Sequence, residues 1–315
     1  MEKISVVIPM YNSEKSIRHV IDELISVLTE YRKFDYEIIV VDDCGDDGAI
    51  DVVKEIAHSN EKVKIIELAK NSGQANAMFA GYMYCTGDFI VSMDDDYQHP
   101  AASIIGMMEK LIDEDLDVVI AKYPITKNSF RRKVFSRINR IMASIMTEIP
   151  ADIQTNSFFV MRKIICETVC NYPHNTPYVY GIIFTATSRV ANYDVIHRER
   201  LSGKSNYAFG PLFRIWLNGF FSFSAMPLKV VASIGLILAV VAGIMGLVIL
   251  VLGLIANQML VQGWTSTVLL IIFFSGMQLL SVGLLGGYIS RMYSTQSRLP
   301  NFLVRKQTNF YDDDA

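Results

Sequence analysis

The sequence predicts an α/β protein with a mainly parallel sheet, followed by a C-terminal hairpin of two transmembrane helices. Three observations support this fold class. Apolar runs of strand length alternate with helical patterns over the first 123 residues. The chain of 315 residues is 51% hydrophobic with a mean hydropathy of +0.29. From Val230 to Ser290 it contains no Asp, Glu, Lys, Arg or His, so the apolar excess lies in one segment.

The N-terminal region is expected to alternate strands and helices. The apolar runs at 4–9, 36–41, 63–68, 89–93 and 118–123 indicate strands, and the segments 13–30, 49–58, 73–85 and 101–113 between them indicate helices. Strands that are apolar almost throughout are typical of a parallel sheet covered on both faces. No GxGxxG follows the first strand and no GxxxxGK[ST] is present, which disfavours dinucleotide-binding and P-loop proteins.

Two apolar runs near the C-terminus, 230–255 and 267–289, each exceed the ~20 residues that a helix needs to cross a bilayer. The link between them, 256–266, is uncharged and carries Trp264 at an interfacial position. Because the positive charges lie outside the hairpin, the positive-inside rule places both flanking regions in the cytoplasm. These charges are Lys229 before it and Arg291, Arg298, Arg305 and Lys306 after it.

The organisation that follows is a cytoplasmic α/β domain over 1–210, an interfacial amphipathic segment over 211–229, two transmembrane helices within 230–290 and a cytoplasmic tail over 291–315. The four cysteines lack CxxC spacing, and a cytoplasmic location keeps them reduced. The net charge of −3 argues against a nucleic-acid partner.

Three adjacent aspartates, 94–96, directly follow the strand predicted at 89–93 and precede Gln98. The carboxyl ends of strands are where open α/β sheets bind ligands, and Asp42 and Asp43 end another strand of the same sheet. Carboxylate oxygens suit a hard cation such as Mg²⁺ or Mn²⁺, which in proteins commonly also holds substrate phosphates. The alternative is a solvated acidic turn, but its position in the sheet favours a metal site.

A basic stretch lies between the predicted sheet and the membrane hairpin. Its cations alternate with apolar residues in a helical pattern, which favours a role at a membrane surface or lipid headgroup over a solvated surface helix. The cations are Lys127, Arg131, Arg132, Lys133, Arg137 and Arg140.

Together these features resemble the family-2 glycosyltransferases of the GT-A fold. More narrowly they are similar to the polyisoprenyl-phosphate glycosyltransferases, the group of GtrB-like and dolichol-phosphate-mannose-synthase-like enzymes. The resemblance covers nearly the whole chain and rests on the order and spacing of several short motifs. They are Val-Val-Ile-Pro-Met-Tyr-Asn at 6–12, Val-Asp-Asp at 41–43, Asn-Ser-Gly-Gln-Ala-Asn-Ala at 71–77, Met-Asp-Asp-Asp-Tyr-Gln-His-Pro at 93–100, Arg-Leu-Ser-Gly-Lys-Ser at 200–205 and Gly-Tyr-Ile-Ser-Arg-Met-Tyr at 287–293.

The resemblance implies a role for individual residues. Those expected to bind the nucleotide-sugar are Pro9, Tyr11, Asn12, Asp43, Gln74, Asp94, Asp95 and Lys204. Those expected to hold Mg²⁺ or Mn²⁺ are Asp94, Asp96 and Gln98. Those expected to face the acceptor phosphate are Lys122, Arg132 and Ser136. The catalytic set is Asp94, Asp96, Arg200 and Asp152, although Asp152 is equally well explained as an ordinary loop carboxylate.

The expected reaction is metal-dependent, inverting transfer of a sugar from a nucleotide-sugar, by default UDP-glucose, to a polyisoprenyl phosphate, by default undecaprenyl phosphate. A phosphate monoester is largely dianionic at pH 7, so the acceptor needs positioning rather than a general base. The expected setting is the cytoplasmic face of a bacterial inner membrane, in cell-surface glycan (lipopolysaccharide) modification by a homo-oligomer such as a tetramer.

Two alternatives differ from this reaction. A processive polysaccharide synthase on the same fold would carry a Gln-x-x-Arg-Trp motif, which is absent. A non-enzymatic membrane scaffold or accessory protein would be free to lose the aspartates at 94–96, and all three are present.

Overall fold

The computed structural model describes residues 1–123, 150, 153–171, 179–196, 198, 264–296 and 300–310, and scattered residues between 233 and 251. The chain divides into two compact units, one formed by 1–206 with 298–315 and the other by 207–297. The interfacial segment 211–229 and the basic stretch 127–140 lie outside the described residues.

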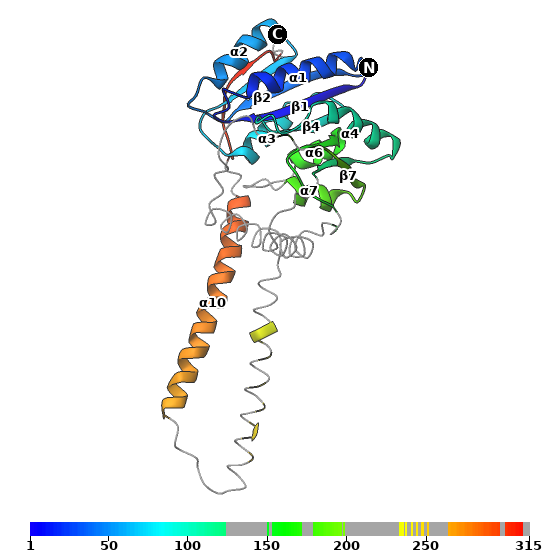
Figure 1. Cartoon of the computed structure of the whole chain (residues 1–315). Coiled ribbons are helices and arrows are strands. Elements are labelled where there is room, and N and C mark those ends of the chain that lie inside the picture. The colour runs from blue at the N-terminus through cyan, green and yellow to red at the C-terminus, as the bar shows by residue number, and fades with distance from the viewer. Residues whose placement is uncertain are drawn as a thin grey trace. The chain divides into compact units, whose positions relative to one another are not determined.

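The first unit contains the predicted β-α alternation (Figure 1). Its elements, in chain order, are β1 Lys3–Met10, α1 Ile17–Glu30, β2 Asp35–Asp42, α2 Ala49–Ser59, β3 Val63–Leu68, α3 Gln74–Met83, β4 Phe89–Ser92, α4 Ala102–Asp113, β5 Val118–Lys122, β6 Phe159–Arg162, α6 Lys163–Asn171, α7 Val179–Ala186, β7 Val190–Asp194 and β8 Val304–Thr308.

Within the described residues, the strands form one eight-stranded sheet in the order β7-β5-β6-β4-β1-β2-β3-β8. The pairs β1–β2, β1–β4, β2–β3 and β5–β7 are parallel. Strand β6 is antiparallel to β4 and β5, and β8 is antiparallel to β3. The predicted mainly parallel sheet is therefore confirmed. Its neighbouring central strands β4, β1 and β2 end in predicted motifs, with aspartates after β4 and at the end of β2 and Tyr11-Asn12 after β1.

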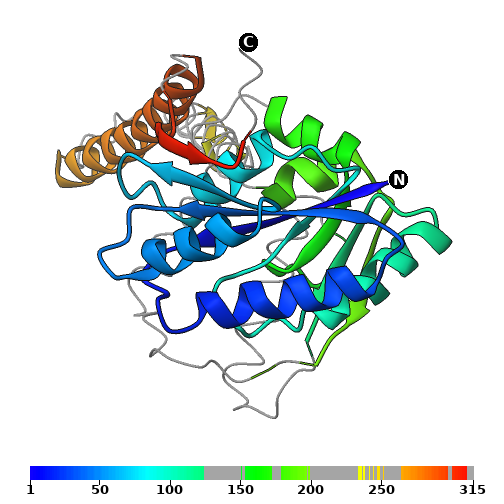
Figure 2. The ribbon, with the colours of Figure 1, turned by 90° about the horizontal axis from the view of Figure 1, so that it is seen from above.

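Helices cover both faces of the sheet (Figure 2). One hydrophobic cluster joins alternate residues of β1 and β2, such as Val6, to α1, α2 and α4. The other joins the intervening strand residues, such as Val7, to α3, α6 and α7. Both residues are fully buried, because successive side chains of a strand point to opposite faces and each face is covered.

Strand β8 was not predicted, because the C-terminal tail reads as a charged segment. In the structure it forms the sheet edge beside β3, and aromatic residues just before and just after it pack against the first unit. Phe302 packs against Phe79 of α3, and Phe310 packs against Tyr84. The chain therefore returns after residue 297 to the unit that it left at 206.

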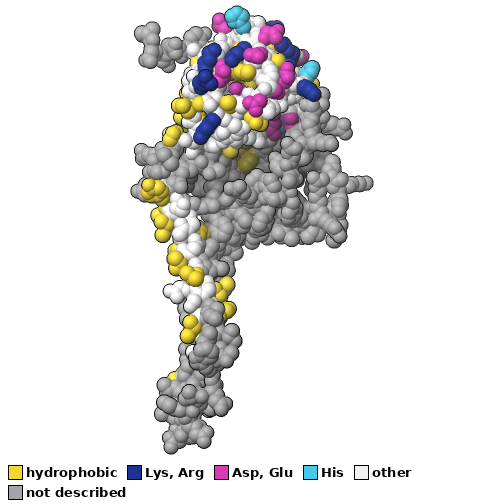
Figure 3. Space-filling model, turned by 90° about the vertical axis from the view of Figure 1, so that its left-hand side faces the viewer, with side chains coloured by type: hydrophobic (Ala, Val, Ile, Leu, Met, Phe, Trp, Pro, Cys, Tyr) yellow, Lys and Arg dark blue, Asp and Glu magenta, His cyan; other side chains and the backbone are white. Residues whose placement is uncertain are grey.

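The second unit contains α10, Trp264–Gln296, which includes the predicted second transmembrane run. Its window Phe273–Ser290 is long and apolar enough to cross a membrane, with a mean hydropathy of 1.3. Hydrophobic side chains are exposed along this helix, among them Phe273, Leu279 and Ile289 (Figure 3). Of the first predicted run, 230–255, the described residues are helical, and the remainder lies outside the described part of the chain.

Candidate active site

The carboxyl ends of β4, β1 and β2 bring three predicted motifs together. The main-chain N–H of Asp43 donates to the carbonyl of Met10 at 2.9 Å, which places the end of β2 beside the end of β1. The N–H of Tyr11 donates to Asp95 Oδ2 at 3.0 Å, which connects β1 to the aspartates after β4. Tyr11, Asp43 and Asp95 are thus adjacent, as expected for residues of one ligand site.

Asp43 fixes the loop that leads into α3. Its Oδ1 accepts the N–H of Ser72 at 2.6 Å and its Oδ2 accepts the N–H of Gly73 at 2.9 Å. Gly73 has a φ of 87°, a conformation that residues with a Cβ rarely adopt. Burial raises the pKa of Asp43, while the two main-chain hydrogen bonds oppose that shift. The carboxylate therefore positions the Ser72-Gly73 turn at the edge of the predicted nucleotide site.

Three polar side chains from separate parts of the chain contact Asp94. Its Oδ1 accepts Gln74 Nε2 at 2.7 Å, and its Oδ2 accepts Ser157 Oγ at 2.5 Å and lies 3.1 Å from His99 Nε2. The other ring nitrogen of His99 bonds to the hydroxyl of Tyr123. Gln74 was predicted to belong to the site, and the structure places it in contact with Asp94.

Ser157 and Tyr123 were missed by the sequence analysis. Ser157 lies two residues before β6, which pairs with β4, and Tyr123 directly follows β5. A serine after a segment without a clear pattern gives no signal in the sequence, so only the sheet order could have shown that Ser157 reaches Asp94. His99 is buried, and its two ring nitrogens face Asp94 and the hydroxyl of Tyr123.

The other two aspartates have different surroundings. Burial raises the pKa of Asp95 to about 6, although the hydrogen bond from the N–H of Tyr11 opposes that shift. Asp96 Oδ1 accepts the N–H of Gln98 at 3.1 Å across a turn in which Tyr97 has a φ of 66°. The turn places Asp96 and Gln98 on one short loop, two residues apart.

The donor set fits a hard divalent cation by its chemistry. Asp94, Asp96 and Gln98 supply carboxylate and amide oxygens within five residues at the end of one strand. Such oxygens are the ligands that Mg²⁺ and Mn²⁺ prefer. No group of three or more His, Cys, Asp or Glu side chains in the described part of the chain could hold a metal, so Gln98 or a substrate oxygen would have to complete the set.

The remaining predicted donor residues in the described chain surround the same edge. Pro9 lies at the end of β1 opposite Val41. Asn12 has a φ of 54°, and its Oδ1 accepts the N–H of Asp46 at 2.8 Å, which joins the loops that follow β1 and β2. Pro9 and Asn12 therefore lie at the same strand ends as the aspartates.

The predicted acceptor and catalytic sets are described only in part. Lys122 ends β5, and its Nζ lies 3.8 Å from Asp194 Oδ1 of β7. Asp94 and Asp96 of the catalytic set are described above. The remaining residues of both sets, and Lys204 of the predicted donor set, lie outside the described residues; they are Arg132, Ser136, Asp152 and Arg200.

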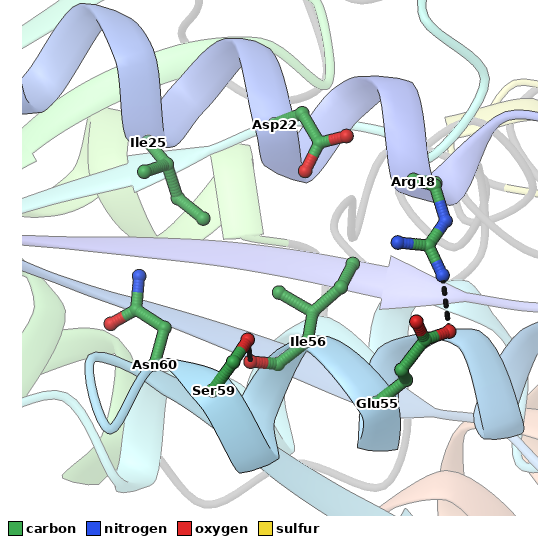
Figure 4. Close-up of a pocket in the computed structure, with 7 residues that line it drawn as sticks. All are labelled: Arg18, Asp22, Ile25, Glu55, Ile56, Ser59 and Asn60. Carbon is green, nitrogen blue, oxygen red and sulfur yellow. Dashed lines mark hydrogen bonds and ion pairs between the residues drawn. The ribbon is translucent and has the colours of Figure 1, made fainter.

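A separate polar groove of about 310 Å³ lies between α1 and α2 (Figure 4). Arg18 of α1 and Glu55 of α2 form an ion pair of 2.5 Å beside it. None of the seven residues that line it belongs to the predicted site. The groove lies between two helices that cover one face of the sheet, and it is distinct from the candidate site at the strand ends.

Comparison with known proteins identifies the family. Residues 5–170, which span β1 to α6, match the family model described as "Glycosyl transferase family 2". This chain belongs to glycosyl transferase family 2. It is a glycosyltransferase, and the alternative of a non-enzymatic membrane scaffold is set aside.

Similar proteins match this family-2 chain over nearly its whole length. It is 30% identical over 308 residues to an uncharacterized glycosyltransferase of Synechocystis, covering 96% of this chain and 94% of the relative. It is 27% identical to the bactoprenol glucosyl transferase of Shigella phage SfX, with 97% and 99% covered. It is also 27% identical to the undecaprenyl-phosphate 4-deoxy-4-formamido-L-arabinose transferase of Photorhabdus laumondii, with 97% and 94% covered. The narrower resemblance to the polyisoprenyl-phosphate group is thereby confirmed.

Solved structures share the fold of this glycosyltransferase at low sequence identity. The mannosyltransferase PcManGT from Pyrobaculum calidifontis, in complex with GDP-Man and Mn²⁺, aligns with a TM-score of 0.52 and 19% identity over 70% of this chain and 63% of its own. Glucosyl-3-phosphoglycerate synthase from Mycobacterium tuberculosis, in complex with Mn²⁺, UDP and phosphoglyceric acid, aligns with a TM-score of 0.52 and 16% identity over 70% and 76%. These likenesses support the GT-A-like α/β fold.

Proposed function

We propose that this glycosyltransferase transfers a sugar from a nucleotide-sugar to a polyisoprenyl phosphate, with inversion at the anomeric carbon and with Mg²⁺ or Mn²⁺. UDP-glucose and undecaprenyl phosphate are the substrates to test first. The observation that carries the proposal is the gathering of Tyr11, Asp43, Gln74 and the aspartates 94–96 at one edge of the sheet. The relatives suggest the acceptor class, since two of them are named as bactoprenol and undecaprenyl-phosphate transferases.

The donor leaves as a nucleoside diphosphate, so the site has to stabilise growing negative charge. A divalent ion held by Asp94, Asp96 and Gln98 would supply that stabilisation when bound. The chain keeps Asp94 in place through Gln74 and Ser157, which are fixed on α3 and beside β6. Arg200 and Lys204, assigned from the motif at 200–205, would add positive charge to the same diphosphate.

The acceptor is expected to react as a dianion. A phosphate monoester with its second pKa near 6 is already ionised at pH 7, and its oxygen can displace the diphosphate in one step without a general base. One displacement inverts the anomeric carbon. Lys122, Arg132 and Ser136 are proposed to hold the acceptor phosphate.

The membrane hairpin is part of the proposal, because a lipid acceptor has to meet the site at the bilayer. Residues 1–206 and 298–315 belong to one unit, and β8 pairs with β3. A chain that leaves and re-enters the same domain must cross a bilayer an even number of times in between. The window Phe273–Ser290 of α10 is apolar enough to span a membrane. If it does so, the apolar run 230–255 is long enough in the sequence to supply the second crossing.

The test uses the full-length protein in lipid nanodiscs with undecaprenyl phosphate, UDP-[¹⁴C]glucose and Mn²⁺. The expected result is a radioactive lipid in the organic phase, UDP released in equal amount, and loss of both when EDTA is added. Parallel reactions with other nucleotide-sugars identify the donor if glucose is not transferred.

Two outcomes would contradict the proposal. A radioactive polymer that grows without lipid phosphate would support the processive synthase. Transfer that continues unchanged in EDTA would remove the metal from the mechanism. The inverting course is checked separately by NMR of the anomeric proton in the product lipid.

A further inference from the structure

The loop that carries Asp96 and Gln98 has a backbone conformation that needs support. Tyr97, between them, has a φ of 66°, which β-carbon-bearing residues other than Asn and Asp rarely adopt. That turn lets the Gln98 N–H bond to Asp96 Oδ1 at 3.1 Å. Strained backbone at a functional site persists only where surrounding contacts hold it.

Arg198 supplies several of those contacts from a distant part of the chain. Its guanidinium lies over the ring of Tyr97, 5.1 Å from the ring centroid. Two hydrogen bonds join the main chain of Arg198 to Gln98. The Arg198 N–H donates to the Gln98 carbonyl at 3.4 Å, and Gln98 Nε2 donates to the Arg198 carbonyl at 3.5 Å. The ring of His19 in α1 also contacts Tyr97, at 6.0 Å between centroids.

Glu23 of α1 holds Arg198 in this position. Its Oε2 lies 2.6 Å from Arg198 Nη1, and its Oε1 accepts the N–H of Ala101 at 3.2 Å. Ala101 is the residue just before α4, at the far end of the same loop. The Glu23 carboxylate therefore binds both Ala101 at the end of the loop and Arg198, which lies over Tyr97. The side chains of Glu23 and Arg198 are 19% and 37% exposed.

We propose that Arg198, held by Glu23, is a positioning residue that fixes the Tyr97 turn and so presents Asp96 and Gln98 to the divalent ion of the donor complex. The inference rests on the proposed function, because it assigns a supporting contact to the proposed metal ligands. It does not need Arg198 to touch substrate. An arginine suits this role better than a lysine, since its planar fork can stack on a ring and pair with a carboxylate at once.

The experiment measures metal binding directly. Mn²⁺ is titrated into the full-length protein in detergent and free Mn²⁺ is followed by its EPR signal, in separate series with UDP and with GDP. Losing a contact that orients metal ligands costs about 10–100-fold in metal affinity in other proteins. For Arg198→Ala we expect Mn²⁺ affinity to fall by about tenfold or more, and for Arg198→Lys by less. The matched control Arg18→Ala removes another α1 ion pair, with Glu55, and is expected to leave Mn²⁺ affinity unchanged.

The Glu23 contact is tested by a double-mutant cycle. Glu23→Gln should weaken Mn²⁺ binding, and Glu23→Gln with Arg198→Ala should weaken it no further than Arg198→Ala alone, because both act through one contact. Melting temperatures of all variants separate a lost metal site from a lost fold. Unchanged Mn²⁺ affinity in folded Arg198→Ala, or fully additive effects, would overturn the inference while leaving the proposed function intact. If wild-type protein fails to bind Mn²⁺ in the presence of UDP and also in the presence of GDP, both the inference and the proposed function are overturned.

Discussion

At the scale of single residues, the three adjacent aspartates coexist because each has different neighbours. Asp94 is held by Gln74, His99 and Ser157, and Asp95 accepts the N–H of Tyr11. Asp96 accepts a hydrogen bond from the N–H of Gln98 in its own loop. Like charges so close repel one another, and burial together with that repulsion raises the pKa of Asp95 to about 6. A cation bound at Asp94 and Asp96 would offset the repulsion, which is why this run favours a metal site over a solvated turn.

Removal of one carboxylate tests that assignment. We expect Asp96→Asn to lower transfer by at least about 10²-fold, since the amide keeps the size of the side chain but weakens its hold on a divalent ion. Steady-state rates over a range of Mn²⁺ concentrations are the measurement. Glu61→Gln, which removes an exposed carboxylate before β3, is the control and should keep wild-type rates. Activity in Asp96→Asn with the wild-type Mn²⁺ dependence would rule Asp96 out as a ligand.

A second buried carboxylate, Glu37 of β2, contributes to stability at the opposite end of the sheet. Its side chain is 1% exposed and lies 2.8 Å from Lys64 Nζ and 2.9 Å from Lys3 Nζ. Ser5 and Thr86 also donate to it. Burial by itself would raise the pKa of Glu37, but these hydrogen bonds outweigh it and lower the pKa to about 2.

The lowered pKa of Glu37 predicts a stability that depends on pH. A carboxyl group with a lower pKa in the folded state stabilises the fold above its unfolded pKa, 4.5, and the stabilisation is lost as pH falls toward 2. The shift corresponds to roughly 3 kcal/mol. We expect Glu37→Gln to lower the melting temperature at pH 7 and to flatten its decline between pH 5 and pH 3. A variant that declines as steeply as wild type would show that other groups cause the acid sensitivity.

At the scale of elements, Gly81 lets α3 pack against β1 and β2 with no room for a side chain between them. A Cβ at this position would lie 2.3 Å from Val7 Cγ1 of β1 and 3.1 Å from Val41 Cγ2 of β2. Val7 and Val41 are fully buried, so neither can move aside easily. Since Gln74 at the start of α3 contacts Asp94, this close packing also positions the candidate site.

We therefore expect Gly81→Ala to destabilise the protein by about 1–3 kcal/mol and to lower activity. The measurement is the melting temperature together with the transfer rate. Gly276→Ala in α10 is the matched control, because no described atom lies within 4 Å of its added Cβ, and it should be neutral or slightly stabilising. Val7→Ala should partly rescue Gly81→Ala, and purely additive losses would argue against a steric cause.

Asn309, just after β8, connects this strand to α2 and to the start of β3. Its Nδ2 donates to the carbonyls of Ala57 at 2.7 Å and Val63 at 2.8 Å, and its φ is 63°. Asn309→Asp keeps the shape and tolerates the backbone but cannot donate, so we expect a loss of roughly 1–3 kcal/mol in unfolding free energy. Gln307→Ala, which removes one exposed bond to Tyr84, should cost much less by the same melting assay. Equal losses of unfolding free energy in the two variants would contradict a larger stabilising contribution from the Asn309 hydrogen bonds.

The sequence predicted the elements whose signal is local. Strands β1 to β5 are buried apolar runs separated by helices, and the aspartates at 94–96 were visible as a charge run at a strand end. Strand β7 is only half-buried and β8 carries Arg305 and Lys306 at an edge, so neither shows an apolar or alternating pattern. The bond from Ser157 to Asp94 joins residues 63 positions apart, which no local pattern reveals.

At the scale of the whole molecule, the connection between the two units constrains how the predicted hairpin would cross a membrane. The segment 207–297 is a unit of its own, and the residues before and after it both belong to the first unit. Its helix α10 exposes apolar side chains along its length. Charge pattern and topology therefore agree, because the basic flanks Lys229 and Arg291 both lie at ends of the uncharged stretch. Both lines of reasoning predict a hairpin whose link, 256–266, faces away from the catalytic domain.

Reporter fusions in bacterial cells test this topology. Alkaline phosphatase, which is active only outside the cytoplasm, should be active when fused after Val261 and inactive when fused after Gln307. Green fluorescent protein, which folds in the cytoplasm, should fluoresce at the second position, where the tail lies in the sheet as β8. The reason is that the charged flanks stay on the cytoplasmic side while the uncharged link crosses. Phosphatase activity at neither position would mean that the segment lies along the membrane surface. Activity at both positions would contradict the predicted cytoplasmic location of the tail and of the domain whose sheet it shares.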